Sequence, residues 1–346
     1  MSNVPLAVGL ALVAGILNGS FATPMKFAKF WKWENIWSVW GIMGMLVFPW
    51  VAVWLTIPNA WSVFQVAGLR VLLLMVLFGV GFGLAQIFFG LGIAAIGIAL
   101  NFAIAIGLAT ALGSLVPLLA LQRQKIFTPQ GYMIFLGVGL ILAGIVGCAT
   151  AGGMKEKQLA AAAPRPKEST AVKMSFKAGV FICILAGIGS PCTNFGLAFG
   201  KPLIKAAIAQ GVGPGSQANV IWAPLNTAAL IPYLAYCAYL WKKNGSARLF
   251  RAPGTALNWV LGAAMGLFWF GSTVIYGGVS ARLSEMGPIL GWPLFMSSII
   301  ITSNVWGFVT GEWKTAGNKA LGTMLAGILF LILGFVALAL SGRLAG

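Results

Sequence analysis

Long apolar runs separated by short polar stretches follow one another along the whole chain. A helix that crosses a bilayer needs about 20 predominantly apolar residues. Divided by this length, the runs predict ten membrane-spanning helices. They cover residues 4–24, 36–57, 70–92, 97–120, 131–150, 178–200, 218–241, 258–280, 286–309 and 320–341.

Residues 71–121 are almost unbroken in their apolar character and hold the third and fourth predicted spans. A single helix of this length would be about 75 Å long at 1.5 Å per residue. The hydrocarbon core of a bilayer is only about 30 Å thick. The chain must therefore turn back between Gly92 and Gly97, and the turn must be tight because the segment contains no charged residue.

The longest polar stretch, AGGMKEKQLAAAAPRPKESTAVKMSFK, covers residues 151–177 and is predicted as a flexible cytoplasmic linker. It separates an N-terminal five-helix repeat, residues 1–150, from a C-terminal five-helix repeat, residues 178–346. The tripeptide Ala-Gly-Ile recurs at corresponding places, residues 14–16 and 186–188. Because five is odd, the second half must lie upside down relative to the first. Inverted repeats of this kind are typical of transporters with a substrate site near the membrane midplane.

The predicted fold is therefore an all-α polytopic membrane protein with ten transmembrane helices in two inverted five-helix repeats. The composition agrees, since 60% of the residues are hydrophobic and 8% are charged, against about 25% charged in a soluble domain. A net charge of +17 would suggest nucleic acid for a soluble protein. Here most lysines and arginines lie in loops between apolar runs, so the bilayer is the expected partner and nucleic acid is not.

The distribution of lysine and arginine predicts the orientation. The loops after the odd-numbered spans carry fifteen: Lys26, Lys29, Lys32, Lys155, Lys157, Arg165, Lys167, Lys173, Lys177, Lys242, Lys243, Arg248, Arg251, Lys314 and Lys319. The opposite side carries seven: Arg70, Arg123, Lys125, Lys201, Lys205, Arg282 and Arg343. The richer side is expected in the cytoplasm. Both termini are then extracytoplasmic, and the segment from Lys29 to Glu34 lies at the cytoplasmic interface with its tryptophans in an aromatic belt.

Metal, cofactor and enzyme chemistry are not expected. The chain has no histidine and no aspartate, and its four cysteines lie singly inside apolar runs. A nitrogen or sulfur metal site needs clustered ligands, and hydrolytic or transferase chemistry generally needs carboxylates, histidine or a metal. A channel is also not favoured, because the sequence has no filter-like repeat and no ring of pore charges.

Several motifs resemble one transporter family. The segment KWENIWSVWGI (residues 32–42), followed by Pro49-Trp50 and by Pro58-Asn59-Ala60-Trp61, resembles the L-rhamnose–proton symporter family of the drug/metabolite transporter superfamily. Further similar segments are residues 187–190, Phe195, Lys201-Pro202, residues 265–283 and residues 311–313. The resemblance covers nearly the whole chain. It implies a secondary transporter of the inner membrane that carries a sugar together with a proton.

The chain departs from the family pattern at four places within the spans. In the third span the family has an asparagine and a tyrosine where this chain has Gln86 and Phe89. A glutamine of the eighth span is replaced by Ser272, and an acidic residue near the start of the ninth span is replaced by Pro288. The fold implied by the resemblance is unaffected by these changes, which bear on the identity of the sugar and on proton coupling.

A sugar site inside a membrane needs amides and hydroxyls for the sugar hydroxyls and an aromatic face for its C–H surface. Trp269, Ser272, Thr273 and Tyr276 share one face of the eighth span at helical spacing. The predicted substrate-binding residues are Asn18, Gln86, Asn101, Ser190, Asn194, Trp269, Ser272, Thr273, Tyr276 and Asn304. Each of these residues also has a structural alternative. Serine and threonine often form hydrogen bonds with carbonyl groups of their own helix, and asparagine and glutamine often join helices. Aromatic residues along one helix face commonly pack against neighbouring helices. Trp292 is expected to be an interfacial anchor.

Proton coupling requires a group that can bind and release a proton, and proton relays usually use an acidic residue or a histidine within a span. Glu156 and Glu168 fall in the predicted linker, whereas Glu34, Glu285 and Glu312 stand at span ends. We expect Glu34 to pair with a nearby lysine as an anchor. Glu285, at the predicted outer mouth, is the candidate for proton coupling.

The favoured function is a secondary transporter that moves a small neutral sugar, such as L-rhamnose or a related monosaccharide, by alternating access. Proton symport is implied by the resemblance alone. The alternatives are an exporter of amino acids or other small metabolites within the same superfamily, and an uncoupled facilitator. An exporter of cationic drugs is disfavoured because it would use an acidic residue inside the membrane.

Overall fold

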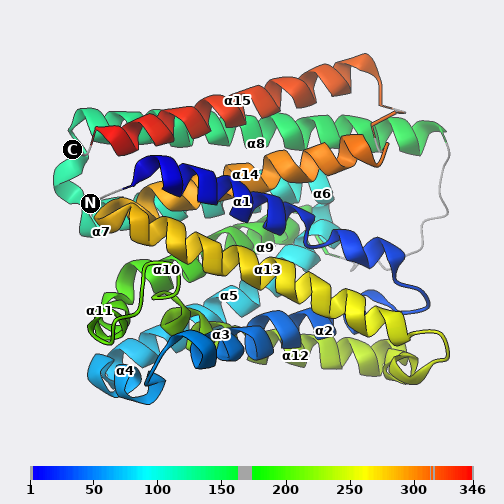
Figure 1. The fold of residues 1–346 in the computed structure, drawn as a ribbon. Helices are drawn as coiled ribbons and strands as arrows, with labels where there is room; N and C mark the ends of the chain where they lie inside the picture. Colours follow the sequence, from blue (N-terminus) through cyan, green and yellow to red (C-terminus); the bar gives the residue numbers. More distant parts are fainter. Residues whose placement is uncertain (1–2, 163–173, 312, 315, 345–346) are drawn as a thin grey trace.

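Ten helices that are long and apolar enough to cross a membrane form the chain's framework. The computed structural model describes residues 3–162, 174–311, 313–314 and 316–344, and the ten predicted spans are confirmed within them (Figure 1). The spans are, in order, α1 (Val4–Ser20), α2 and α3 (Trp33–Ile42 and Phe48–Thr56), α5 (Leu69–Ile96), α6 and α7 (Ile98–Asn101 and Gly107–Leu121), α8 (Pro129–Ala162), α9 and α10 (Phe176–Gly189 and Cys192–Phe199), α12 (Asn219–Asn244), α13 (Ala256–Arg282), α14 (Gly287–Val309) and α15 (Asn318–Arg343).

The turn between the third and fourth spans is as tight as predicted. Helix α5 ends at Ile96 and α6 begins at Ile98, so Gly97 alone separates them. Gly97 has a φ of +85°, a backbone conformation that glycine adopts without steric cost. The absence of a Cβ atom at this residue therefore allows two apolar helices to follow each other directly.

Three spans are interrupted. The second and fourth spans each contain one π-helical turn, at Met43–Val47 and Phe102–Ile106, and such turns often mark functional regions. The sixth span breaks between α9 and α10, where Pro191 stands just before α10. Proline lacks the N–H group that would continue a helix, so the sequence itself accounts for this break.

Two short helices, α4 (Ala60–Ala67) and α11 (Lys201–Ala209), were not predicted. They pack against each other and are joined by paired hydrogen bonds between the main chain of Asn59 and the side chain of Gln210, both 3.0 Å long. They lie at the end of the bundle that also carries both chain termini (Figure 1). We call this the termini end, and the opposite end the linker end.

The predicted linker begins as helix. Residues 151–162 continue α8 beyond the length needed to cross a bilayer, and α9 begins at Phe176. Residues 163–173, which include Glu168, lie outside the described residues, as does Glu312.

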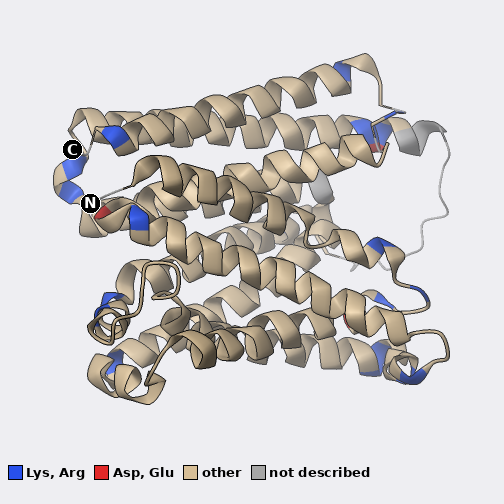
Figure 2. Cartoon of the chain, in the orientation of Figure 1, with Lys and Arg blue, Asp and Glu red and all other residues tan. Residues whose placement is uncertain are grey.

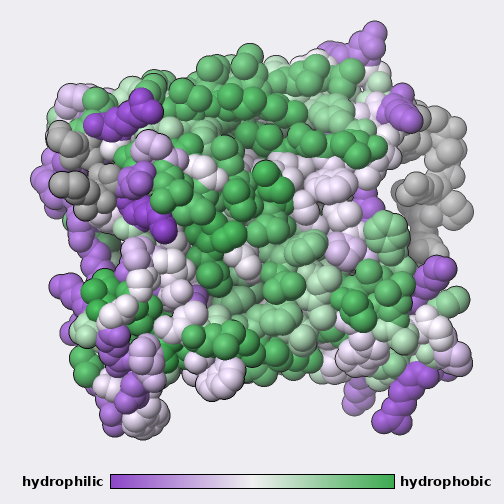
Figure 3. Space-filling view, in the orientation of Figure 1, coloured by the Kyte–Doolittle hydropathy of each residue, from purple (hydrophilic) through white to green (hydrophobic). Residues whose placement is uncertain are grey.

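The surface has the polarity that a bilayer requires. Lysine and arginine residues gather at the two ends of the bundle (Figure 2), and apolar side chains cover much of the middle of the face shown in Figure 3. Exposed apolar side chains of the spans include Leu77 of α5, which is 64% exposed, and Leu333 of α15, which is 46% exposed. The described part of the chain is thus a multi-pass membrane protein.

Packing across the two halves of the chain is close and depends on glycine. Helix α8 lies along α15, and Gly137 and Gly334 bring their backbones together. A Cβ atom on Gly334 would come within 2.7 Å of the Gly137 carbonyl oxygen. Helix α1 lies against α13 and α14, and α9 lies against α5 and α7. In lipid, helices are held together by van der Waals packing because the hydrophobic effect does not act between them. Small residues strengthen this packing, since they let the helix backbones approach closely.

Replacing Gly334 with leucine should destabilise the protein, because the new side chain cannot fit against the backbone of α8. Overpacking of this kind costs about 1–3 kcal/mol. Thermal unfolding in detergent should show a lower Tm for Gly334→Leu than for the control Gly322→Leu. Gly322 is an exposed position of the same helix with open space around it. Equal Tm values for the two variants would contradict the tight α8–α15 contact.

Candidate functional site

Asn194 joins four helices near the termini end. Its Nδ2 donates hydrogen bonds to the carbonyl oxygens of Gly113 in α7, at 2.6 Å, and Pro288 in α14, at 2.9 Å. The hydroxyl of Tyr276 in α13 donates to its Oδ1. Asn194 itself lies in α10 and is fully buried. We call these four residues the Asn194 junction. In this conformation both amide hydrogens of Asn194 are used within the protein.

Further bonds hold the fourth and ninth spans together beside the Asn194 junction. Trp292 in α14 donates from its indole nitrogen to the Ala109 carbonyl at 2.9 Å, and the Ser114 hydroxyl donates to the Ile289 carbonyl at 2.7 Å. Trp292 is 6% exposed, so it lies between helices and is not the interfacial anchor that we expected. The bundle is therefore tightly joined at this level.

A second polar contact lies between the first and eighth spans. Asn18 in α1 donates from Nδ2 to the Ser272 hydroxyl at 2.8 Å. Ser272 and Thr273 each donate to the carbonyl of Trp269 in their own helix, at 2.6 and 3.1 Å. These hydroxyls thus have the intrahelical bonds that are common for serine and threonine in membranes.

An aromatic cluster occupies the middle of the bundle. The ring of Trp269 is stacked on Phe82 of α5, with centroids 6.2 Å apart and planes inclined by 14°. Trp40 of α2 meets the same ring edge to face at 5.3 Å. Trp269 and Phe82 keep 9% and 7% of their surface accessible. Trp269 therefore lies in an aromatic cluster inside the bundle, packed against Phe82 and Trp40.

The remaining predicted residues lie apart from these groups. The Ser190 hydroxyl and the Asn304 amide donate to their own helices, at Ala186 and Ile300. Asn101 accepts a hydrogen bond from the Cys183 thiol at 3.0 Å near the linker end, while its Nδ2 has no partner among the described residues. Gln86 is half-buried and makes no side-chain hydrogen bond within the described part of the chain.

Sequence reasoning missed a group of buried polar residues in the second and seventh spans. Within the described residues, Trp40, Trp222, Asn226 and Tyr233 each carry a buried polar atom that has no hydrogen-bond partner. Trp222, Asn226 and Tyr233 recur on one face of α12 at helical spacing. This spacing is the signal in the sequence that could have identified them.

The described carboxylates stay at the ends of the spans. Glu285 forms an ion pair with Lys201 and accepts a hydrogen bond from Gln122 at 3.4 Å, and its side chain is 64% exposed. Glu34 is only 3% exposed. Its hydrogen-bond donors are Asn244, at the end of the seventh span, and Ser246, just beyond it. The positive charge of Lys32 also stabilises the carboxylate, so Glu34 anchors α2 to this end of the seventh span. The described residues contain no cluster of potential metal ligands.

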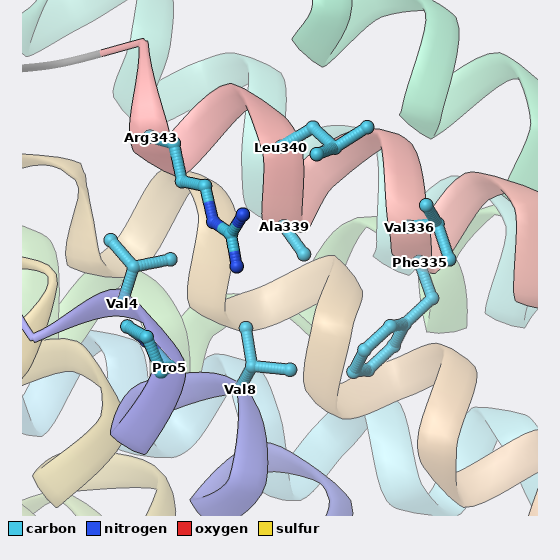
Figure 4. Close-up of a pocket in the computed structure, with 8 residues that line it drawn as sticks. All are labelled: Val4, Pro5, Val8, Phe335, Val336, Ala339, Leu340 and Arg343. Atoms are coloured by element: carbon cyan, nitrogen blue, oxygen red, sulfur yellow. The ribbon is translucent and has the colours of Figure 1, made fainter.

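One surface pocket is a groove of about 400 Å³ between α1 and α15 at the termini end. Aliphatic side chains and Phe335 line it, with Arg343 at its rim (Figure 4). It lacks the amides and hydroxyls that would hold a sugar. The groups suited to a sugar are those in the bundle interior.

Comparison with known proteins identifies the family. The family model for the L-rhamnose-proton symport protein (RhaT) matches residues 1–342. The chain belongs to this family. Among its relatives, the L-rhamnose-proton symporter of Cronobacter sakazakii is 27% identical over 340 residues, 96% of each chain. That of Salmonella typhi is 28% identical over 341 residues, 96% of this chain and 97% of the relative. That of Yersinia pestis is 27% identical over 329 residues, 93% of each. The protein is therefore a transporter-family member and not an enzyme.

Replacing Asn194 with alanine should lower the stability of this RhaT-family protein, because two carbonyl groups and the Tyr276 hydroxyl lose their partner. Interhelical hydrogen bonds in membranes contribute about 0.6–2 kcal/mol each. The Tm in detergent should fall clearly for Asn194→Ala and little for Asn304→Ala, whose amide bonds only its own helix. Similar Tm values for the two variants would show that the Asn194 junction does not hold the four helices.

Proposed function

We propose that the protein is a secondary transporter that moves a small neutral sugar, L-rhamnose or a related monosaccharide, across the inner membrane in symport with protons. The match of residues 1–342 to the rhamnose–proton symport family carries this proposal. The chemistry of the interior supports it. Amides, hydroxyls and aromatic rings meet between the spans, whereas the described carboxylates stand at span ends. Such an interior suits an uncharged solute.

Alternating access of two inverted five-helix repeats is the proposed transport mechanism. In two repeats of five spans, the first span corresponds to the sixth, the third to the eighth and the fourth to the ninth. Helix α1 lies against the eighth and ninth spans, and α9 lies against the third and fourth. Phe82 of the third span and Trp269 of the eighth stack on each other, as equivalent residues near a two-fold axis would. These neighbour relations support the repeat, whose interface is the usual place for a substrate site.

The termini end is proposed to face the periplasmic side. Both termini lie at this end (Figure 1), and the opposite end carries the greater number of lysines and arginines along the sequence. The positive-inside rule then assigns the linker end to the cytoplasm. On this orientation the Asn194 junction closes the outer part of the bundle. Opening toward the outside would require its bonds to part.

A panel of ligands tests the substrate class. Thermal unfolding of the detergent-solubilised protein should shift upward with neutral monosaccharides, because a ligand that binds only the folded state stabilises it. L-rhamnose and other 6-deoxy sugars should give the largest shift, and amino acids and lipophilic cations should give none. An upward shift of the Tm with amino acids alone would contradict sugar transport and favour the alternative function, an exporter of amino acids.

Glu285 is the proposed proton acceptor at the outer mouth. Its protonation would weaken the ion pair with Lys201 and the bond from Gln122, and these two residues belong to segments that precede and follow the linker. We expect Glu285→Gln to bind sugar with unchanged affinity but to lose the stimulation of uptake by an inward proton gradient in vesicles. The control is Glu156→Gln, an exposed residue of α8. Full stimulation in Glu285→Gln would exclude this residue from coupling, and equal uptake by the wild type with and without a gradient would indicate a facilitator.

A further inference from the structure

Asn226 is the most unusual polar residue of the bundle. It is fully buried in α12, and neither its Nδ2 nor its Oδ1 has a hydrogen-bond partner among the described residues. A buried amide without partners costs free energy, and most buried polar groups in proteins are satisfied. Asn18 and Asn194 show how asparagine joins helices in this bundle, since each bonds to another span. Asn226 makes no such bond, so a helix-joining role does not explain it.

The face of α12 that carries Asn226 points into the centre of the bundle. Trp222 and Tyr233 lie on the same face, one turn before and two turns after Asn226. The Trp222 ring meets Tyr276 of α13 with centroids 6.4 Å apart. The Tyr233 ring meets Trp40 of α2 at 5.7 Å. Asn226 thus stands between two contacts that connect its face with α13 and α2.

The third span, α5, packs closely against α12 beside the face that carries Asn226. Gly79 and Gly83 of α5 pack so closely on α12 that a Cβ atom on either would come within 2.2 Å of the carbonyl oxygen of Leu225 or Ala229. The same helix presents Phe82, which stacks on Trp269. The part of α12 that carries Asn226 therefore packs among the helices that build the aromatic cluster around Trp269.

We propose that Asn226 is the hydrogen-bonding centre of the substrate site, with the ring of Trp269 as the surface on which the ligand stacks. A carboxamide offers two donors and acceptor lone pairs on one oxygen, a set that matches neighbouring hydroxyls of a sugar. The C–H face of the sugar packs on an aromatic ring. No charged side chain belongs to this face of α12, so the ligand is an uncharged polyhydroxylated molecule. This inference rests on the proposed sugar transport and names the site for it.

The decisive variant is Asn226→Leu, which keeps the branched shape and the number of heavy atoms of the side chain and removes its polar atoms. Titration calorimetry with L-rhamnose, or with the sugar that gives the largest thermal shift, measures its affinity. We expect the affinity to fall at least tenfold, while the Tm without sugar stays equal or rises because an unpartnered amide has been replaced by an apolar group. The matched control is Asn219→Leu on the same helix. Its amide donates to Thr56 at 3.1 Å, so this variant should lose stability and keep its sugar affinity within twofold.

Each other outcome would overturn the proposal. Unchanged sugar affinity in Asn226→Leu would remove Asn226 from the site. A large loss of Tm, or failure to fold, would show that Asn226 has a structural partner that the proposal denies. A wild-type protein that binds none of the sugars would reject the proposed function, and this inference with it. Sugar binding by the wild type and equally by Asn226→Leu would reject the inference alone.

Discussion

The hydrocarbon core of a bilayer offers no hydrogen-bonding partners, and this constraint accounts for most of the polar contacts in the bundle. Asn194 satisfies its amide with carbonyls of two other spans and with Tyr276. Asn18 bonds to Ser272, and several hydroxyls bond to their own helices. The bonds of Asn194 and Asn18 fix the distances between particular helices, whereas the intrahelical bonds only satisfy the hydroxyls. Asn226, which is not paired, stands out against this background as a residue whose partner is a ligand.

The same constraint separates charge from the interior. Described carboxylates stand at span ends, where Glu285 pairs with Lys201 and Glu34 is held by neutral donors. The centre consists of the rings around Trp269 and of neutral polar groups. An interior of this kind can accept a neutral solute without leaving a charge unpaired, whereas a charged one would pay a desolvation penalty that nothing nearby offsets. The proposed sugar site in the interior and the proposed proton site at its edge are therefore compatible within one transporter.

The ten spans could be predicted from the sequence because the length of an apolar run is a local property. A turn between Gly92 and Gly97 followed from the same count, and the structure places it at Gly97. The roles of the polar residues could not be predicted as well, because their partners are distant in sequence and often belong to the backbone. Nothing near Asn194 indicates that the carbonyls of Gly113 and Pro288 will meet it. Helices α4 and α11 were missed because they are shorter than a span. Asn226 was missed because its lack of hydrogen-bond partners can be seen only in the folded chain.

A cryo-electron microscopy structure of the protein with bound monosaccharide tests the central claim most directly. We expect density for the sugar in the middle of the bundle, with its hydroxyls within hydrogen-bond distance of both polar atoms of Asn226 and its C–H face on the Trp269 ring. Sugar density elsewhere, for example beside Asn304 and Gln86 with Asn226 untouched, would contradict it.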